Sequence, residues 1–167
     1  WTRSAAALAD IDGDLDSEIF LTTSTGRLYG FQGNGAALPG FPKTGMTAIF
    51  SSPAVGDVDD DGFPEIVVAA ENDSLYVFNH DGSRLTGWPM RLVNTNDTIK
   101  CPSPALADIT GDGVPEIFAV SVHDDHHTEL GWLDVNAAWL PGWPVTFDGH
   151  SQAGATVGDL DGDGDFE

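Results

Sequence analysis

Four acidic segments of nine residues share one pattern of side chains in this chain of 167 residues. Each segment places side chains that carry oxygen at its first, third, fifth and ninth positions. These positions hold Asp10, Asp12, Asp14 and Glu18; Asp57, Asp59, Asp61 and Glu65; Asp108, Thr110, Asp112 and Glu116; and Asp159, Asp161, Asp163 and Glu167. Alternate spacing in a tight turn points short side chains at one centre, and the longer Glu completes the coordination. A hard cation with roughly six to eight oxygen ligands needs this arrangement, and Ca²⁺ fits it best.

Two other interpretations of these loops fit less well. Solvated acidic turns would not keep the same ligand spacing four times over. An EF-hand shares the first three ligand positions, but its loop ends in a bidentate Glu at position 12. The first three segments have Leu21, Val68 and Ala119 at that position. The sequence therefore predicts up to four Ca²⁺ ions, one in each loop, in sites that are not EF-hands.

The composition excludes several classes of protein. The formal net charge is −21, and the six Lys and Arg residues are scattered singly, so no nucleic-acid partner is expected. Hydrophobic residues make up 41% of the chain, which is enough for a packed core. No apolar run approaches the roughly 20 residues of a membrane-spanning helix. Calcium loops of modest affinity stay loaded only where calcium is abundant, which favours a secreted or cell-surface protein in an extracellular or periplasmic setting.

The acidic loops belong to longer repeats. They begin at residues 10, 57, 108 and 159, in steps of 47, 51 and 51 residues. A second motif keeps register with them over residues 28–42, 75–89 and 130–144, and each copy ends in an aromatic residue followed by Pro. A period near 50 residues indicates repeated supersecondary units.

Four short strands are predicted in each unit. In the second unit they comprise residues 53–56 before the acidic loop, residues 65–70 after it, residues 75–78, and a strand that ends at Trp88-Pro89. No stretch has a helical period long enough to compete. Four short antiparallel strands joined by tight turns describe one blade of a β-propeller, so the predicted fold is all-β.

Two kinds of residue fit fixed places in such a blade. The first strand of each unit is rich in small residues, which suits the crowded innermost position, at residues 5–9, 53–56, 104–107 and 155–158. The large aromatic residues Phe41, Trp88 and Trp143 are assigned to the outermost strand, where they are expected to pack between adjacent blades. Stacking on a sugar is the alternative role for these three rings.

The acidic loops and the strands around them resemble the FG-GAP/VCBS repeats, which build the calcium-binding propellers of integrin α-subunits and of many secreted bacterial proteins. The resemblance covers essentially the whole chain. It implies that each loop joins the first and second strands of its blade and holds one Ca²⁺ through the side chains named above. It also implies main-chain carbonyl ligands from Asp16, Phe63, Val114 and Asp165.

Two loops depart from the pattern of this family. Thr110 replaces an Asp in the third loop and removes one negative charge. The fourth loop reaches its last ligand at Glu167, the final residue of the sequence. The third and fourth sites are therefore expected to bind more weakly than the first two.

The predicted blades do not close a ring. They span approximately residues 4–46, 51–93 and 102–150, with an incomplete blade at 151–167, whereas propellers have about four to eight blades. The chain is therefore expected to be part of a seven- or eight-bladed propeller. Its expected partners are the remaining blades of the same protein or copies of itself, because open apolar faces normally find a partner.

The third unit carries an insertion rich in histidine. From the last loop Glu to the next motif the gap is 10 residues in the first two units and 14 in the third. The added segment includes His123, His126 and His127 with carboxylates beside them. We interpret it as a solvated hairpin tip, and a zinc, nickel or copper site is the alternative.

No set of nucleophile, base and orienting group is recognisable in the sequence. The leading functional prediction is a non-catalytic extracellular module for adhesion or ligand binding, with structural calcium and an unidentified protein or carbohydrate ligand. The alternative is the propeller portion of a secreted carbohydrate-active enzyme such as a polysaccharide lyase, which only fold analogy supports.

Overall fold

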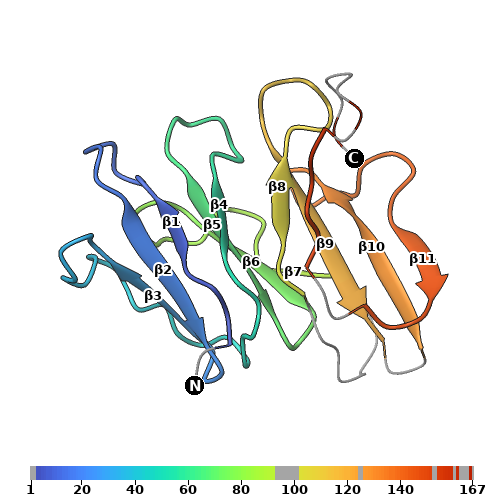
Figure 1. Cartoon of the computed structure of the whole chain (residues 1–167), viewed down its shortest axis with the longest axis horizontal. Coiled ribbons are helices and arrows are strands. Elements are labelled where there is room, and N and C mark those ends of the chain that lie inside the picture. The colour runs from blue at the N-terminus through green and yellow to red at the C-terminus, as the bar shows by residue number, and fades with distance from the viewer. Residues whose placement is uncertain are drawn as a thin grey trace.

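The computed structural model describes residues 3–92, 102–123, 126–151, 154–159, 161 and 166. These residues form three antiparallel β-sheets that stand side by side (Figure 1). No helix is present in this described part of the chain, and hence none that could cross a membrane. The all-β prediction is confirmed.

The strands of each sheet follow one another along the chain. The first sheet contains β1 (Ala7–Ala9), β2 (Glu18–Thr23) and β3 (Arg27–Phe31). The second contains β4 (Ala54–Gly56), β5 (Glu65–Ala70), β6 (Ser74–Phe78) and β7 (Met90–Arg91). The third contains β8 (Ala105–Ala107), β9 (Glu116–Val122), β10 (His127–Leu133) and β11 (Val145–Asp148). Neighbours in sequence are neighbours in each sheet, which is the meander of a propeller blade.

The outermost strand of the second sheet lies later in the chain than predicted. We expected a strand that ends at Trp88-Pro89, but β7 starts after Pro89 and pairs Met90 with Leu75. The Trp88 N–H donates to the Leu85 carbonyl across 3.2 Å in a turn, and Pro89 has no N–H to donate. Continuous strand pairing therefore begins only beyond the proline, and before it this segment makes one isolated bridge, from Phe78 to Arg84.

The outermost strand position is organised differently in the two other sheets. In the first sheet the outermost position consists of two isolated bridges, from Leu28 to Lys43 and from Phe31 to Ala37. In the third sheet β11 again follows the aromatic–proline pair. The three proline peptide bonds that end the repeated motif are all cis, at Phe41-Pro42, Trp88-Pro89 and Trp143-Pro144.

The predicted innermost strand at residues 155–158 is not formed. Residues 154–159 are described, but they belong to no strand. In the other units this strand pairs with the strand that follows the acidic loop, and residues 159–167 contain only the loop. Ala155, Thr156 and Val157 instead border a hollow of about 250 Å³ with Trp132 and Trp143 of the third sheet.

The second sheet lies between the other two, and its side chains are buried on both faces. All residues of β5 and β6 are buried. Val67 and Val77 pack in one hydrophobic cluster with Ile117 of the third sheet. Ile66 and Tyr76 of the same two strands pack in a second cluster that contains residues of the first sheet. Alternation along a strand sends successive side chains to opposite faces, so one sheet supplies both cores.

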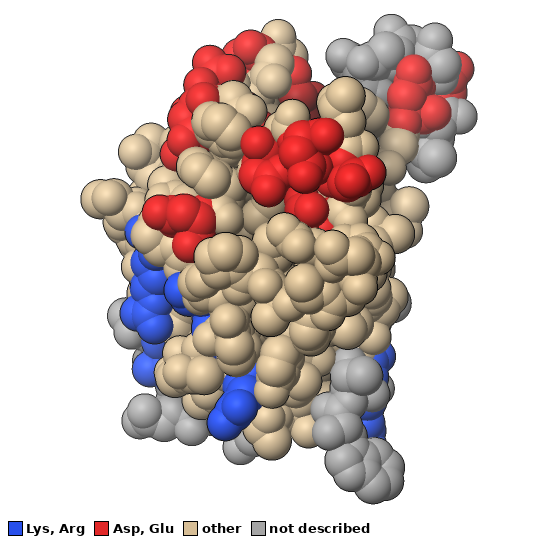
Figure 2. Space-filling model, turned by 90° about the vertical axis from the view of Figure 1, so that its left-hand side faces the viewer, with Lys and Arg blue, Asp and Glu red and all other residues tan. Residues whose placement is uncertain are grey.

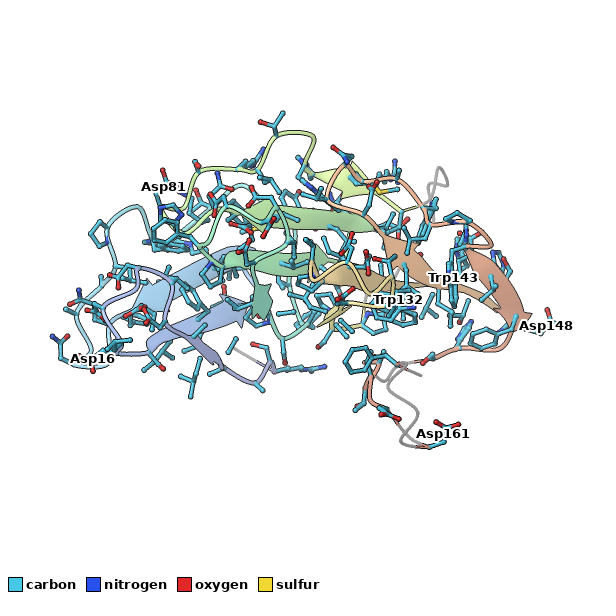
Figure 3. All side chains as sticks on the ribbon, turned by 90° about the horizontal axis from the view of Figure 1, so that it is seen from above. Asp16, Asp81, Trp132, Trp143, Asp148 and Asp161 are labelled. Carbon is cyan, nitrogen blue, oxygen red and sulfur yellow. The ribbon has the colours of Figure 1, made fainter. Side chains whose placement is uncertain are left out.

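The repeated aromatic residues pack between sheets, as predicted, where a following sheet is present. Trp88 of the second unit is buried, and its indole N–H donates to the Val135 carbonyl of the third unit across 3.0 Å. Phe41 lies against Gly82 of the second unit. Trp143 instead lies beside Trp132 on the outer face of the third sheet (Figure 3), near Phe118, whose ring centroid is 6.4 Å away.

Serine hydroxyl groups also join neighbouring units. The Ala5 N–H donates to Ser52 Oγ across 2.9 Å, and the Ser52 N–H donates to Ser103 Oγ across 2.8 Å. All three residues lie five positions before the start of an acidic loop. The equivalent residue of the fourth unit is Gly154, which lies against Ser103 and has no hydroxyl.

Candidate metal centre

The acidic loops gather at one end of the molecule. The first three join β1 to β2, β4 to β5 and β8 to β9, and they lie along the upper edge in Figure 1. Figure 2 shows Asp and Glu side chains concentrated at this end, whereas the Lys and Arg side chains on that face lie lower. The strands thus place the acidic loops together and, on this face, away from the cationic side chains.

The Glu at position nine is the first residue of the second strand of each sheet, and it is buried. Glu18, Glu65 and Glu116 are 1%, 0% and 7% exposed. In all three loops its Oε2 atom accepts the N–H of the second loop residue across 3.0 Å. This bond ties the start of the loop to its end, and it leaves Oε1 available for another interaction.

The first Asp of each loop holds the turn in shape. Asp57 Oδ2 accepts the N–H of Gly62 across 3.0 Å, and the equivalent bonds to Asp10 and Asp108 are 2.9 and 2.7 Å. The residue that donates this bond has a left-handed backbone, with φ of 91° at Gly62 and 73° at Leu15. Glycine adopts this conformation without a steric penalty, which explains why two of the three loops have it there.

The structure brings several predicted ligands close together. One oxygen each from Asp10, Asp12 and Glu18 lies within 4.8 Å of the others, and the same is true of Asp57, Asp59 and Asp61. Carboxylate oxygens repel one another at such distances unless protons or a cation compensate them.

Two oxygen atoms of the second loop make the strongest case for a cation. Asp57 Oδ1 and Glu65 Oε1 are buried and have no hydrogen-bond partner among the described residues. A buried polar atom without a partner is destabilising by about 1–3 kcal/mol, and more when it is charged. A hard cation that prefers oxygen would satisfy Asp57 Oδ1 in its trio with Asp59 and Asp61, and Glu65, which lies outside that trio, would have to approach it to take part. This all-oxygen donor set fits Ca²⁺.

The third loop differs from the first two, as predicted from the presence of Thr110 in place of an Asp. The Thr110 hydroxyl donates to Glu116 Oε1 across 3.0 Å, so the second oxygen of this Glu is already engaged. Among the described residues, no trio of acidic side chains in this loop is as close as those of the first two. Fewer charges and an occupied Glu support weaker binding here.

The remaining predicted ligands are only partly described. Asp159 and Asp161 of the fourth loop are described, whereas Asp163, Asp165 and Glu167 lie outside the described residues. Ligation by the carbonyl groups of Asp16, Phe63 and Val114 stays a prediction. The N–H groups of these three residues donate to the Asp at position five across 2.8 to 2.9 Å, which fixes the loop at this point.

A second turn lies beside the acidic loops, and sequence reasoning missed it. A hollow of about 340 Å³ has Asp14 and Glu18 on one side and Gln32 and Asn34 on the other. Another of about 300 Å³ lies between the second and third loops and is bordered by the turn that begins at Asp134.

In the second unit this neighbouring turn also contributes buried polar atoms. Asn79 Oδ1 and His80 Nδ1 have no hydrogen-bond partner among the described residues, and the His80 ring stacks on Phe63 of the loop at 4.4 Å between centroids. The spacing could have revealed this turn, because Gln32 and Asn79 each follow the last loop Glu by 14 residues.

Burial makes the second loop sensitive to pH. Burial and the nearby carboxylates of Asp59, Asp61 and Asp57 raise the pKa of Glu65 from 4.5 to about 7, although the hydrogen bond from Val58 opposes the shift. The folded, calcium-free protein therefore keeps a proton that the unfolded chain loses. Its stability should be greatest below pH 4.5 as far as this group is concerned, and it should fall by about 3 kcal/mol as the pH rises through 7.

Urea denaturation of the calcium-free protein at pH 5 and pH 7.5 measures this effect. The Glu65→Gln variant is the control, because it cannot titrate and should lose most of the difference between the two pH values. Stability that is constant or higher at pH 7.5 in the unmodified protein would contradict a raised pKa at Glu65.

Comparisons with known proteins agree with this architecture. A model of the FG-GAP-like repeat matches residues 10–68 and 57–119, which together span more than half of the chain. No curated protein matches the sequence. Among solved structures, the crystal structure of BBS1N in complex with ARL6DN, soaked with lead, matches with a TM-score of 0.66 at 15% identity.

The match to that structure covers 96% of this chain and 48% of the other chain, so this chain spans about half its length. At this level of identity the likeness is one of fold. It confirms the prediction of a partial β-propeller, whose three described sheets form an incomplete ring.

Proposed function

Because this chain belongs to the FG-GAP-like repeat family, we propose that it is a calcium-binding propeller module with an interaction or structural role. The pair of buried oxygens without partners at Asp57 and Glu65 carries the calcium part of this proposal. Propellers of such repeats are typically non-catalytic modules, which supports a role in binding.

In each loop, some carboxylate oxygens accept backbone hydrogen bonds that hold the turn, and others are available to bind the ion. In the second loop, Glu65 Oε2 and Asp57 Oδ2 accept backbone N–H groups and keep the turn closed. Glu65 Oε1 and Asp57 Oδ1 are left for the ion. Bound Ca²⁺ would neutralise the clustered carboxylates and join the end of β4 to the start of β5.

Several finer statements belong to this proposal. The protein is secreted or displayed at the cell surface, because loops of this kind need abundant calcium to stay loaded. Its ligand is a protein or a carbohydrate. The remaining blades of its own chain, or a second copy, cover the outer face of the third sheet, because Trp143 and Phe118 are only partly buried there.

Isothermal titration with Ca²⁺ tests the calcium-binding role. We expect Glu65→Gln to remove one binding event, because the second loop loses the charge and one oxygen of its buried ligand. Glu71→Gln is the matched control, since this residue lies in the turn after β5 and outside the loops, and it should titrate like the unmodified protein. An unchanged stoichiometry in Glu65→Gln, or no calcium binding at all, would overturn the proposal.

The third loop offers a gain-of-affinity test. Thr110→Asp restores the missing carboxylate and removes the hydroxyl that donates to Glu116 Oε1. The third calcium site should therefore tighten by about tenfold, because affinity rises with the number of charged ligands. A titration curve that resolves the sites provides the measurement, and a weaker third site in the variant would contradict the assignment.

A further inference from the structure

Three side chains that can ligate a metal meet at the end of the third sheet remote from its acidic loop. β9 begins with Glu116 of that loop and runs away from it, so the turn to β10 lies at the opposite end of the sheet (Figure 1). His123 follows β9 directly, and His127 and Glu129 lie in β10. One ligand atom from each lies within 4.8 Å of the other two.

The backbone places these side chains on one face of the hairpin. The His123 N–H donates to the His127 carbonyl across 2.9 Å, so the two residues oppose each other across the strands. Their rings stack with centroids 4.0 Å apart at 15°. Glu129 follows His127 by two residues, and alternation along a strand puts both on the same side.

His123 is buried, so the prediction of a solvated hairpin tip is wrong for this residue, whereas His126 of the same segment is exposed. His123 is 2% exposed, and neither of its ring nitrogens has a hydrogen-bond partner among the described residues. Its Nε2 atom lies 3.7 Å from Glu129 Oε2, which is too long for a hydrogen bond. A buried imidazole almost always has hydrogen-bond partners for its nitrogens. The side chains that lie beside this one, His127 and Glu129, are of types that bind metal ions.

We propose that His123, His127 and Glu129 form a binding site for a divalent transition-metal ion of the Zn²⁺ class. Two imidazoles and one carboxylate are a donor set that zinc uses, with a fourth position left for water or for a donor from another molecule. Calcium is a poor fit, because it prefers oxygen ligands. The three ligand atoms, which lie within 4.8 Å of one another, would have to approach to the spacing of about 3.3 Å that a tetrahedral ion requires.

The site is chemically independent of the acidic loops. Two imidazole nitrogens distinguish this site from the acidic loops, which offer only oxygen, so one kind of site can be loaded with its metal while the other is monitored. Zn²⁺ and Co²⁺ are therefore added to the full chain in saturating Ca²⁺, with a chromophoric chelator as competitor for zinc. We expect one tightly held zinc ion per chain, and visible absorption of the bound Co²⁺ with the intensity of a four-coordinate ion.

Single substitutions decide which residues bind the ion. His127→Ala should weaken zinc binding by at least about a hundredfold and Glu129→Gln by at least about tenfold. His126→Ala is the matched control. This residue is in the same turn, but its ring stacks on His150, with centroids 4.8 Å apart, and it is outside the cluster. The zinc affinity of the His126→Ala variant should stay within about twofold of that of the unmodified protein.

These measurements distinguish a built metal site from adventitious binding by a histidine-rich turn. Circular dichroism and the calcium titration establish that the variants are folded, and Glu129→Gln provides the test if His127→Ala is not. The proposal is overturned if the chain takes up no zinc in competition with the chelator. It is also overturned if His126→Ala weakens binding as much as His127→Ala does, because that is the behaviour of a histidine-rich turn that binds metal adventitiously.

Discussion

Removal of calcium should lower the thermal unfolding midpoint of this protein by about 15 to 30 °C. The expectation follows from three described loops, each of which stabilises the folded state by about 2.7 kcal/mol when the free ion is a hundredfold above its dissociation constant. For a chain of this size, each kcal/mol shifts the midpoint by about 2–4 °C. In each of the first two loops, three carboxylates lie within 4.8 Å of one another. Without the ion their mutual repulsion destabilises the fold further.

Differential scanning calorimetry in millimolar Ca²⁺ and in excess chelator measures the shift at one protein concentration. Magnesium is the control ion, because it demands a smaller octahedral site and keeps its own water ligands. At equal concentration it should restore only a small part of the lost midpoint. A midpoint that chelation does not change would be incompatible with structural calcium.

The Gly26→Ala substitution should destabilise the protein by about 3 kcal/mol or more. Gly26 has φ of 70° in the turn between β2 and β3, and its N–H donates to the Thr23 carbonyl across 3.0 Å. A Cβ atom at this position would overlap the backbone carbonyl oxygen of Met46 and lie 2.6 Å from that of Thr47. Because backbone atoms are in the way, rotation of a side chain cannot relieve the clash.

Gly35→Ala separates this clash from backbone conformation. Gly35 has φ of 85°, but nothing lies within 4 Å of a Cβ atom built on it. Both variants bear the left-handed penalty of about 1–2 kcal/mol, and only Gly26→Ala bears the steric term. Urea denaturation of both variants in saturating Ca²⁺ gives the difference, which we expect to be at least about 2 kcal/mol. Equal destabilisation would show that residues 46 and 47 do not pack against this turn.

The inner three strands of the first three blades could be predicted because their determinants are local. Residues 65–70 form an apolar run that begins at the last loop ligand, and the structure has β5 over the same residues. The outermost strand was placed wrongly, because Trp88 is large and apolar and so looked like part of a strand. Its side chain packs on the next blade, and that contact lies 47 residues away in sequence, at Val135.

Some features of the candidate site likewise depend on local sequence, and others depend on residues that are distant in sequence. The spacing of acids along nine residues was sufficient to identify the loops. It could not show that Glu65 would be buried, since burial comes from the neighbouring sheets. The burial of Asn79 Oδ1 and of His123 also depends on residues that only the fold brings near. Composition alone made that histidine look solvated.

Because the second sheet lies between the other two, we expect it to be the least flexible of the three sheets. Repeated units of this kind derive their stability from their own contacts and from those with immediate neighbours, and only the middle unit has a described neighbour on each side. Amide hydrogens of β5 and β6 should accordingly exchange most slowly, and those of β11, whose four residues are all exposed, much faster. The loop from β4 to β5 is attached to the slowest-opening part of the structure. It is therefore the most pre-organised of the loops and loses the least conformational entropy when it captures an ion.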